Sequence, residues 1–266
     1  MLIGDDNPRR RIARPWACWG LAAALGGAFA AQLGGPELER LLLFDPALLR
    51  ARPTDPAVLL TLLGHAFLHG GLLHLAGNLV ALLVFGDNIE DAFGPLRFLV
   101  IFAACALAGA LLHAAIDTVP LAGASGGIAG LMGAYLLIWP RAKLYLLAFG
   151  RLPVLVPASW FVGFWIAMNI VSAALDPLGE EGVAWFAHIG GFAMGMVLAL
   201  TLRPADVALF QPAAPATAQG WSWFRRLAWD FAPAPATGTQ GTPDEKPAAF
   251  GKAVLFVVLL LSLALV

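Results

Sequence analysis

Six long stretches of this chain contain no Asp, Glu, Lys or Arg, and they restrict its fold more than any other feature. Most of them are long enough for a helix of about 20 residues, the length that crosses a lipid bilayer. Of the 266 residues, 60% are hydrophobic and only 12% are charged, far from the composition of a soluble globular protein. The uncharged stretches are 15–36, 56–86, 98–116, 118–140, 152–175 and 182–202. The sequence therefore predicts an all-α polytopic membrane protein.

We expect six transmembrane helices in these stretches. The first stretch contains Ala28-Phe29-Ala30, which is similar to a signal-peptide cleavage site, but the uncharged run is longer than a signal-peptide core of about 7 to 15 residues. We therefore expect a retained span. The predicted spans are about 15–36, 71–86, 97–115, 125–140, 157–175 and 184–202.

Composition divides the chain into four parts. Residues 1–14 are predicted to be a cytoplasmic N-terminal tail, and 15–203 the membrane domain. Residues 204–250 are rich in Pro and Ala, which is typical of a linker; the aromatic segment 221–226 within it is expected at the membrane surface. The segment 251–266 is hydrophobic, but the 14 residues from 253 onward would reach only about 21 Å as a helix. A seventh span is left open.

Basic residues suggest how the chain is oriented. Arg9, Arg10, Arg11 and Arg14 precede the first span, so the positive-inside rule places the N-terminus in the cytoplasm. The connection 35–70 then lies outside, and its short apolar clusters predict short helices in the outer interface. We expect a bacterial inner membrane, with the site described next opening to the periplasmic side.

A serine surrounded by glycines lies at the start of the fourth span. Ser125 is 16 residues before Arg141, and His188 is 15 residues before Arg203, in two spans that run in the same direction. At 1.5 Å per residue, both side chains lie roughly 22 to 24 Å above the inner charged end. A serine nucleophile needs a base within hydrogen-bonding reach, and His188 lies at the matching depth.

Glycines predict that these two helices approach closely. Gly126 and Gly130 form a Gly-x-x-x-Gly face on the fourth span, and Gly191 and Gly195 form another on the sixth. Such faces let helix backbones come together in lipid. The same pattern is also typical of ordinary helix packing, which by itself requires no chemistry.

Two polar residues of the second span are predicted to complete the site. His74 and Asn78 are four residues apart, so they share one helix face, at about the depth of Ser125. A tetrahedral intermediate needs donors aimed at its oxyanion. An Asn amide, a His N–H and the backbone N–H of Ser125 are suitable donors, so the sequence predicts a hydrolytic site.

Other readings fit less well. The sequence Gly123-Ala-Ser-Gly-Gly127 also matches the nucleophile elbow of soluble hydrolases, but no strand precedes it. A metal cluster of His65, His69 and His74 lacks an accompanying carboxylate within the span. The net charge of −1 and the absence of a basic, aromatic stripe disfavour nucleic acid. A transporter or channel would be expected to carry charged residues inside its spans.

Several further residues are expected to have structural roles. Cys18 and Cys105 are expected to be buried thiols without a disulfide. We interpret His113 as an interfacial residue, and Asn169 as an interhelical hydrogen-bonding partner. Glu90 and Asp91, at the inner end of the second span, are expected to order a loop.

With those residues in place, the chain resembles the rhomboid intramembrane serine proteases over residues 60–200. The resemblance rests on four motifs on spans two, four and six. They are Phe67-Leu-His-Gly-Gly-Leu-Leu-His-Leu-Ala-Gly-Asn78, then Phe85-Gly86 with Glu90, then Gly123-Ala-Ser-Gly126, and then Ala187-His-Ile-Gly-Gly191 with Gly195.

This resemblance implies a six-helix bundle that cleaves peptide bonds in or beside transmembrane segments, without a metal or cofactor. It implies that Ser125 is the nucleophile, that His188 is the general base, and that His74 and Asn78 help to form the oxyanion hole. The implied partners are the lipid bilayer and membrane-protein substrates whose transmembrane segments unwind readily. The implied substrate gate is the fifth span, with bulky residues Trp160, Phe161, Phe164 and Trp165.

The chain departs from the family pattern beside the predicted base. Many rhomboid proteases carry an aromatic residue four positions after the nucleophile, where it packs on the catalytic histidine; this chain has Ala129. The first loop also lacks the frequent Trp-Arg pair. The alternative to a protease is a catalytically inactive rhomboid-like adaptor that binds client transmembrane helices.

Overall fold

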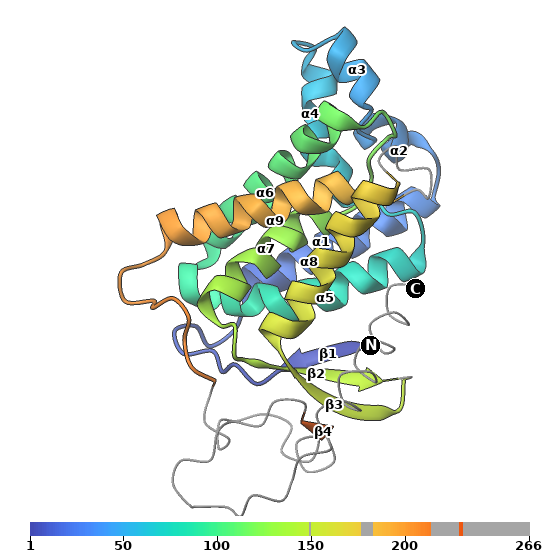
Figure 1. The fold of residues 1–266 in the computed structure, drawn as a ribbon. Helices are drawn as coiled ribbons and strands as arrows, with labels where there is room; N and C mark the ends of the chain where they lie inside the picture. Colours follow the sequence, from blue (N-terminus) through green and yellow to red (C-terminus); the bar gives the residue numbers. More distant parts are fainter. Residues whose placement is uncertain (149, 177–182, 214–228, 231–266) are drawn as a thin grey trace, which may run out of the picture.

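A bundle of apolar helices forms the body of the protein (Figure 1). The structure is a computed structural model that describes residues 1–148, 150–176, 183–213 and 229–230. Within these residues, five helices are long and apolar enough to cross a membrane. They are α1 (Trp16–Leu33), α5 (Leu72–Phe93), α6 (Pro95–Ile116), α8 (Ala158–Leu175) and α9 (Trp185–Leu202). The all-α polytopic membrane fold is therefore confirmed.

The fourth predicted span, 125–140, is a shorter helix at the centre of the bundle. Helix α7 (Ser125–Ile138) has 14 residues, so it is about 21 Å long and shorter than the others. It packs against α5, α6, α8 and α9, and nearly all of its residues are buried. Because protein surrounds α7, its backbone ends do not have to face lipid, where unpaired polar groups are costly.

Glycines join α7 to α9 backbone to backbone. A Cβ atom on Gly191 would overlap the carbonyl oxygen of Gly126, and one on Gly195 would overlap that of Gly130. A Cβ on Gly133 would lie 2.5 Å from the carbonyl oxygen of Phe192. The predicted glycine faces therefore meet each other, and no larger residue fits at these contacts without separating the helices.

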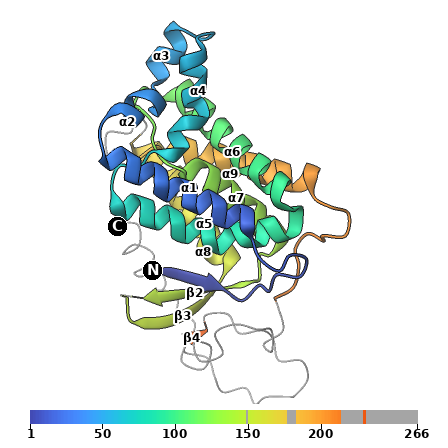
Figure 2. The same cartoon turned by 180° about the vertical axis from the view of Figure 1, so that it is seen from behind.

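Short helices gather at one end of the molecule, as predicted for residues 35–70 (Figures 1 and 2). They are α2 (Glu37–Leu42), α3 (Pro46–Ala51), α4 (Pro56–Gly64) and the 3-10 turn η1 (His65–Phe67). Asp45 and Asp55 each cap the helix that follows, with proline at its first position. We call this end the loop end.

A small β-sheet lies on the opposite side of the bundle, which we call the sheet end (Figure 1). Its strands are β1 (Leu2–Asp5), β2 (Lys143–Ala148), β3 (Leu152–Pro157) and β4 (Trp229–Asp230), in that order. The β1–β2 and β2–β3 pairs are antiparallel, whereas β3 and β4 are parallel. The sequence analysis did not predict this sheet. Strand β1 pairs with residues about 140 positions away and leaves no local pattern, whereas the β2–β3 hairpin is local and was overlooked.

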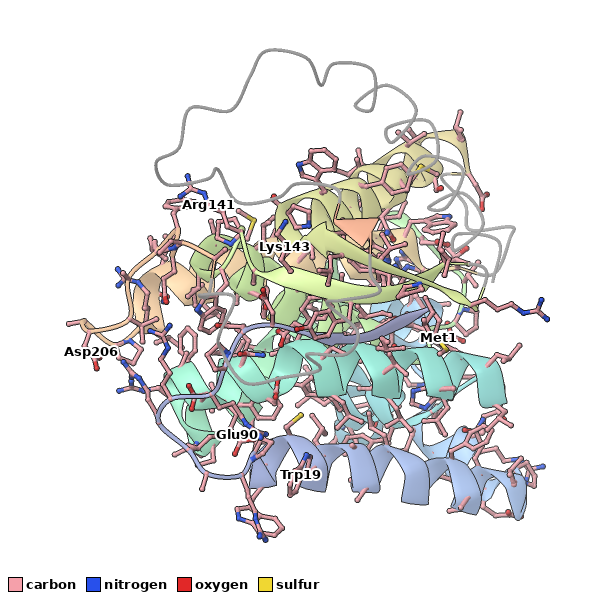
Figure 3. The ribbon with its side chains drawn as sticks, turned by 90° about the horizontal axis from the view of Figure 1, so that it is seen from below. Met1, Trp19, Glu90, Arg141, Lys143 and Asp206 are labelled. Carbon is pink, nitrogen blue, oxygen red and sulfur yellow. The ribbon has the colours of Figure 1, made fainter. Side chains whose placement is uncertain are left out.

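The N-terminal residues are an ordered part of the sheet end rather than a free tail. The Glu90 carboxylate accepts the backbone N–H groups of Ala17 and Cys18 at the start of α1, at 3.1 and 2.7 Å. Figure 3 looks at the molecule from this side, with Glu90 beside the start of α1 and Met1 on the opposite side of the sheet end. Glu90 therefore orders a chain segment, as expected.

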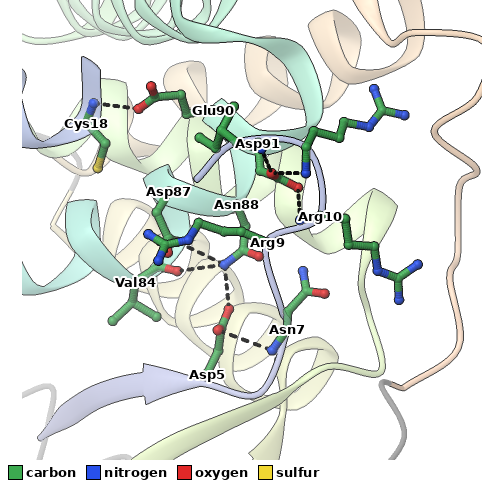
Figure 4. A network of polar contacts seen from close by, with 12 residues as sticks. Asp5, Asn7, Arg9, Arg10, Cys18, Val84, Asp87, Asn88, Glu90 and Asp91 are labelled. Atoms are coloured by element: carbon green, nitrogen blue, oxygen red, sulfur yellow. Dashed lines mark hydrogen bonds and ion pairs between the residues drawn. The ribbon is translucent and has the colours of Figure 1, made fainter. Parts of the chain in front are cut away.

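Two aspartates extend this network (Figure 4). Asp91 accepts the backbone N–H groups of residues 10, 11 and 12 at 2.7 to 2.9 Å. Asp5 accepts from Asn88 Nδ2 of α5 at 2.9 Å and from the Tyr135 hydroxyl of α7 at 2.6 Å. The chain before α1 is thus tied to both α5 and α7.

Several predictions fall on other parts of the chain. Cys18 and Cys105 are both buried free thiols, as expected. The possible seventh span at 253–266, the aromatic segment 221–226 and most of the predicted linker 204–250 lie outside the described residues.

Candidate active site

Ser125 and His188 meet at the loop-end side of the central helices. The Ser125 hydroxyl oxygen lies 2.8 Å from His188 Nε2, a hydrogen-bonding distance. Ser125 is the first residue of α7, and His188 is in the first turn of α9. Both residues are half-buried. The glycine contacts between α7 and α9 thus bring together the two residues that were predicted to lie at the same depth.

The turn before Ser125 is shaped by Gly123 and held from the loop end. Gly123 has φ of +133°, a conformation that favours glycine, and a Cβ here would lie 2.9 Å from His74 Cε1. Its N–H donates to the His65 carbonyl at 2.9 Å, and Leu121 pairs with Phe44. The first loop therefore fixes the position from which α7 begins.

His74 lies next to this turn, with its Nδ1 directed to the residues that precede α5. Its Nδ1 accepts the Gly70 N–H at 3.4 Å, so in a neutral ring Nε2 carries the hydrogen. The space beside Gly123 that Nε2 faces also contains the Ser125 hydroxyl. His74 is exposed. It is therefore placed to donate a hydrogen bond next to Ser125, from a position that a ligand can reach.

Asn78 lies one turn further along the same face of α5. It is only 7% exposed, and its Nδ2 has no hydrogen-bond partner among the described residues. A buried amide without a partner is costly in a native protein. Asn78 thus retains a free donor on the face that His74 presents to the site.

Comparison with known proteins places this site in a family. Residues 56–205 match the Rhomboid domain. The chain belongs to the rhomboid family. The match includes every residue of the predicted site. Together with the membrane-length helices, it makes this rhomboid an integral membrane protein.

Curated relatives are about 30% identical to this rhomboid over the aligned regions. The mitochondrial Rhomboid protein 1 of Saccharomyces cerevisiae is 31% identical over 145 residues, 52% of this chain and 40% of the relative. Rhomboid protease GluP of Bacillus subtilis is 32% identical over 137 residues, which are 51% of this chain and 24% of the relative. Human Rhomboid-related protein 3 is 28% identical over 182 residues, which are 66% of this chain and 43% of the relative. The aligned region thus spans less than half of each of these relatives.

The side of His188 that faces away from Ser125 contacts α8. His188 Nδ1 lies 2.6 Å from Asn169 Oδ1, so the expectation of an interhelical hydrogen bond is confirmed. The ring of Trp165 packs on the imidazole, with centroids 5.4 Å apart and planes at 40°. Sequence reasoning had interpreted Trp165 only as a gate residue. Trp165 and Asn169 are four residues apart in α8, a spacing that places both on one helix face. This shared face was the signal in the sequence that the two residues could act together.

One interpretation of a histidine was wrong. His113 is not interfacial: it is fully buried, and its Nε2 donates to the Val119 carbonyl at 2.8 Å. The ring therefore holds the loop that leads from α6 to Ser125. Position near a helix end suggested the interface, but the folded loop and the short helices of the loop end cover this residue.

The remaining histidines do not form a metal site in the described part of the chain, where no three His, Cys, Asp or Glu side chains gather closely enough. The rings of His69 and His74 are 5.3 Å apart at their centroids. Burial, together with the neighbouring His74, lowers the pKa of His69 to about 4. His69 is therefore neutral at physiological pH.

Proposed function

We propose that this rhomboid is a serine protease that cleaves peptide bonds in or next to transmembrane segments. The observation that carries the proposal is the 2.8 Å contact between the Ser125 hydroxyl and His188 Nε2. A hydroxyl in this arrangement can lose its proton to the imidazole as it attacks a carbonyl carbon. In globular and membrane proteins alike, a nucleophile within reach of an oriented base is the geometric mark of covalent hydrolysis.

The first step forms an acyl-enzyme. His188 Nε2 takes the proton from Ser125 as its Oγ attacks the substrate carbonyl. The resulting oxyanion accepts hydrogen bonds from the backbone N–H of Ser125, His74 Nε2 and Asn78 Nδ2. The α7 dipole adds to this stabilisation, since the oxyanion forms at the helix N-terminus. His188 then returns the proton to the leaving amine.

Water completes the reaction. His188 takes a proton from the water that attacks the acyl carbon, and returns it to Ser125 as the ester bond breaks. The exposure of His74 gives water and substrate a route to the site. Because helical peptide bonds are shielded by their own hydrogen bonds, suitable substrates contain small or helix-breaking residues near the cut.

The proposed orientation follows from the basic residues. Arg9, Arg10, Arg11, Arg141 and Lys143 lie at the sheet end, so we place that end in the cytoplasm and the Ser125 site toward the outside of a bacterial inner membrane.

The alternative is an inactive adaptor that binds client helices. It retains the bundle and α8 but has no use for a hydrogen-bonded Ser125–His188 pair. The pair therefore favours the protease. The adaptor is kept as the second candidate because α8 would contact client helices in either case.

The test is cleavage of a single-span reporter in proteoliposomes by wild type, Ser125→Ala and the control Ser159→Ala. Loss of the nucleophile is expected to lower kcat by at least about 10³-fold. The control serine, at the start of α8, is expected to change it less than twofold. Cleavage that survives in pure Ser125→Ala protein would overturn the proposal.

A fluorophosphonate probe separates the two candidates without a substrate. The protease is expected to be labelled at Ser125, and labelling should vanish in Ser125→Ala and in His188→Gln. Wild-type protein that neither cleaves the reporter nor reacts with the probe would establish the adaptor instead.

A further inference from the structure

We propose that Asn169 of α8 is a positioning residue for His188, one that holds the imidazole in the tautomer able to accept the Ser125 proton. The proposal deepens the proposed protease function and rests on it. It turns the predicted Ser–His pair into a chain of three side chains, in which the third member comes from a helix that carries neither of the other two.

The orientation of the Asn169 amide is fixed by a second hydrogen bond. Its Nδ2 donates to the Trp165 carbonyl, one turn earlier on α8, at 2.8 Å. Only the amide nitrogen can donate to a carbonyl, so Oδ1 must point to His188. An amide oxygen only accepts. His188 Nδ1, 2.6 Å away, must therefore carry a hydrogen.

This hydrogen decides what the other ring nitrogen can do. A neutral imidazole has one N–H, so with the hydrogen on Nδ1 the lone pair is on Nε2, the nitrogen that faces Ser125. The hydrogen bonds then run in one direction, from Ser125 to His188 to Asn169 to the Trp165 carbonyl. The opposite tautomer would point an N–H at the hydroxyl and could not take its proton.

Asn169 also supports the charged ring that forms during the reaction. When Nε2 has taken the proton, both ring nitrogens are donors, and the Nδ1 bond to the amide oxygen becomes charge-assisted. The ring is thus held in place while Nε2 passes the proton to the leaving amine. A similar amide serves the histidine in papain-like proteases.

The packing of α8 suggests that this contact has a specific role. Helix α8, which the structure describes in full, buries Ala158, Val162, Asn169 and Ala173. Asn169 is the polar residue of that set and is only 3% exposed. A buried polar residue inside a membrane helix is costly and marks function. Trp165, on the same face of α8, packs on the imidazole ring of His188.

A purely structural role makes a different prediction. If Asn169 only attached α8 to α9, its loss would lower the melting temperature and leave the chemistry of folded protein unchanged. A positioning role predicts a change in kcat and in the His188 tautomer in protein that remains folded.

The experiment compares Asn169→Leu, Asn169→Asp and the control Val162→Ala, which removes buried volume from α8 two turns away. In proteoliposomes, Asn169→Leu is expected to lower kcat about 10- to 100-fold, with KM within about twofold of wild type. Asn169→Asp keeps an acceptor for Nδ1, so its kcat should stay within about fivefold. Val162→Ala should lower the melting temperature and leave kcat unchanged.

The tautomer is measured directly by ¹⁵N NMR of protein labelled in its five histidines, with His188→Gln used to assign the signal. Wild type and Asn169→Asp should have the hydrogen on Nδ1, and Asn169→Leu should lose this preference. A leucine variant with wild-type kcat and an Nδ1 hydrogen would overturn the proposal, as would an aspartate variant that loses both.

The two proposals can fail separately. Wild type that neither cleaves nor reacts with the fluorophosphonate would refute the protease, and the NMR result would still decide whether Asn169 sets the tautomer. Active wild type with an unchanged leucine variant would refute only the role of Asn169. Should the leucine variant not fold, the aspartate variant alone tests whether an acceptor is sufficient.

Discussion

Helices α9 and α8 both contribute to the surroundings of the predicted base, but they do so in different ways. Helix α9 carries His188 and meets α7 backbone to backbone, with Gly191 and Gly195 against the carbonyls of Gly126 and Gly130. Helix α8 contacts His188 through the side chains of Asn169 and Trp165.

The difference separates two geometric requirements of the site. Backbone contacts set the distance between Ser125 and His188, because neither helix can approach or withdraw without breaking close packing. Side chains from α8 set the direction in which the imidazole faces and which nitrogen has the hydrogen. A backbone interface tolerates almost no substitution, whereas a side-chain contact can be provided by another residue.

Among changes that leave Ser125 and His188 in place, the largest effect is expected from a substitution at the α7–α9 interface. Gly195→Ala places a Cβ against the Gly130 carbonyl, so the helices must separate, and overpacking of this kind costs about 1–3 kcal/mol. A displacement of about 1 Å in a catalytic pair can lower the rate about 100-fold. We therefore expect at least a 100-fold loss of reporter cleavage and a lower melting temperature.

The matched control is on α8. A Cβ on Gly163 meets no atom within 4 Å, so Gly163→Ala should leave cleavage within twofold and slightly favour the helix. Equal losses in the two variants would show that backbone packing does not distinguish the helices.

What could be predicted from the sequence follows the same division. Depth counting placed Ser125 and His188 together, and the glycine faces predicted their close approach, because both arguments depend on helix geometry that is local in sequence. The roles of Asn169 and Trp165 depend on how α8 is rotated against α9, which no local pattern encodes. The pairing of β1 with β2 and the Asp5 network link residues more than 80 positions apart, so they were missed for the same reason.

A smaller effect is expected from Trp165→Ala. The change removes the ring that packs on His188 but leaves the Ser125 hydrogen bond and the Asn169 side chain in place. Aromatic pairs contribute about 0.5–1.5 kcal/mol beyond buried area, so a roughly tenfold fall in kcat is expected. The control is Trp19→Ala on α1, an exposed ring that packs on Trp16. If the two variants retained equal activity, Trp165 would have no part in orienting the base.

The smallest effect on cleavage should come from Asp5, which ties α7 to α5 at the sheet end. Burial, with the nearby Asp87 carboxylate, raises the pKa of Asp5 well above its ordinary value near 3.8. The fold therefore favours the protonated acid. Its stabilising contribution is complete below the unfolded pKa and is lost as the pH rises through the folded pKa.

Asp5→Asn removes this titration while keeping an oxygen that can accept from Tyr135. Thermal melts between pH 4 and 8 are expected to give a wild-type melting temperature that falls with rising pH, and a variant whose fall is smaller by about 2–4 °C. Reporter cleavage at a fixed pH should change less than twofold, because the tie to α5 lies at the opposite end of α7 from Ser125. Parallel melting curves for the two proteins would mean that Asp5 is ionised in the fold. A large loss of cleavage would mean that the distance between Ser125 and His188 depends on the sheet end as well as on the glycine interface.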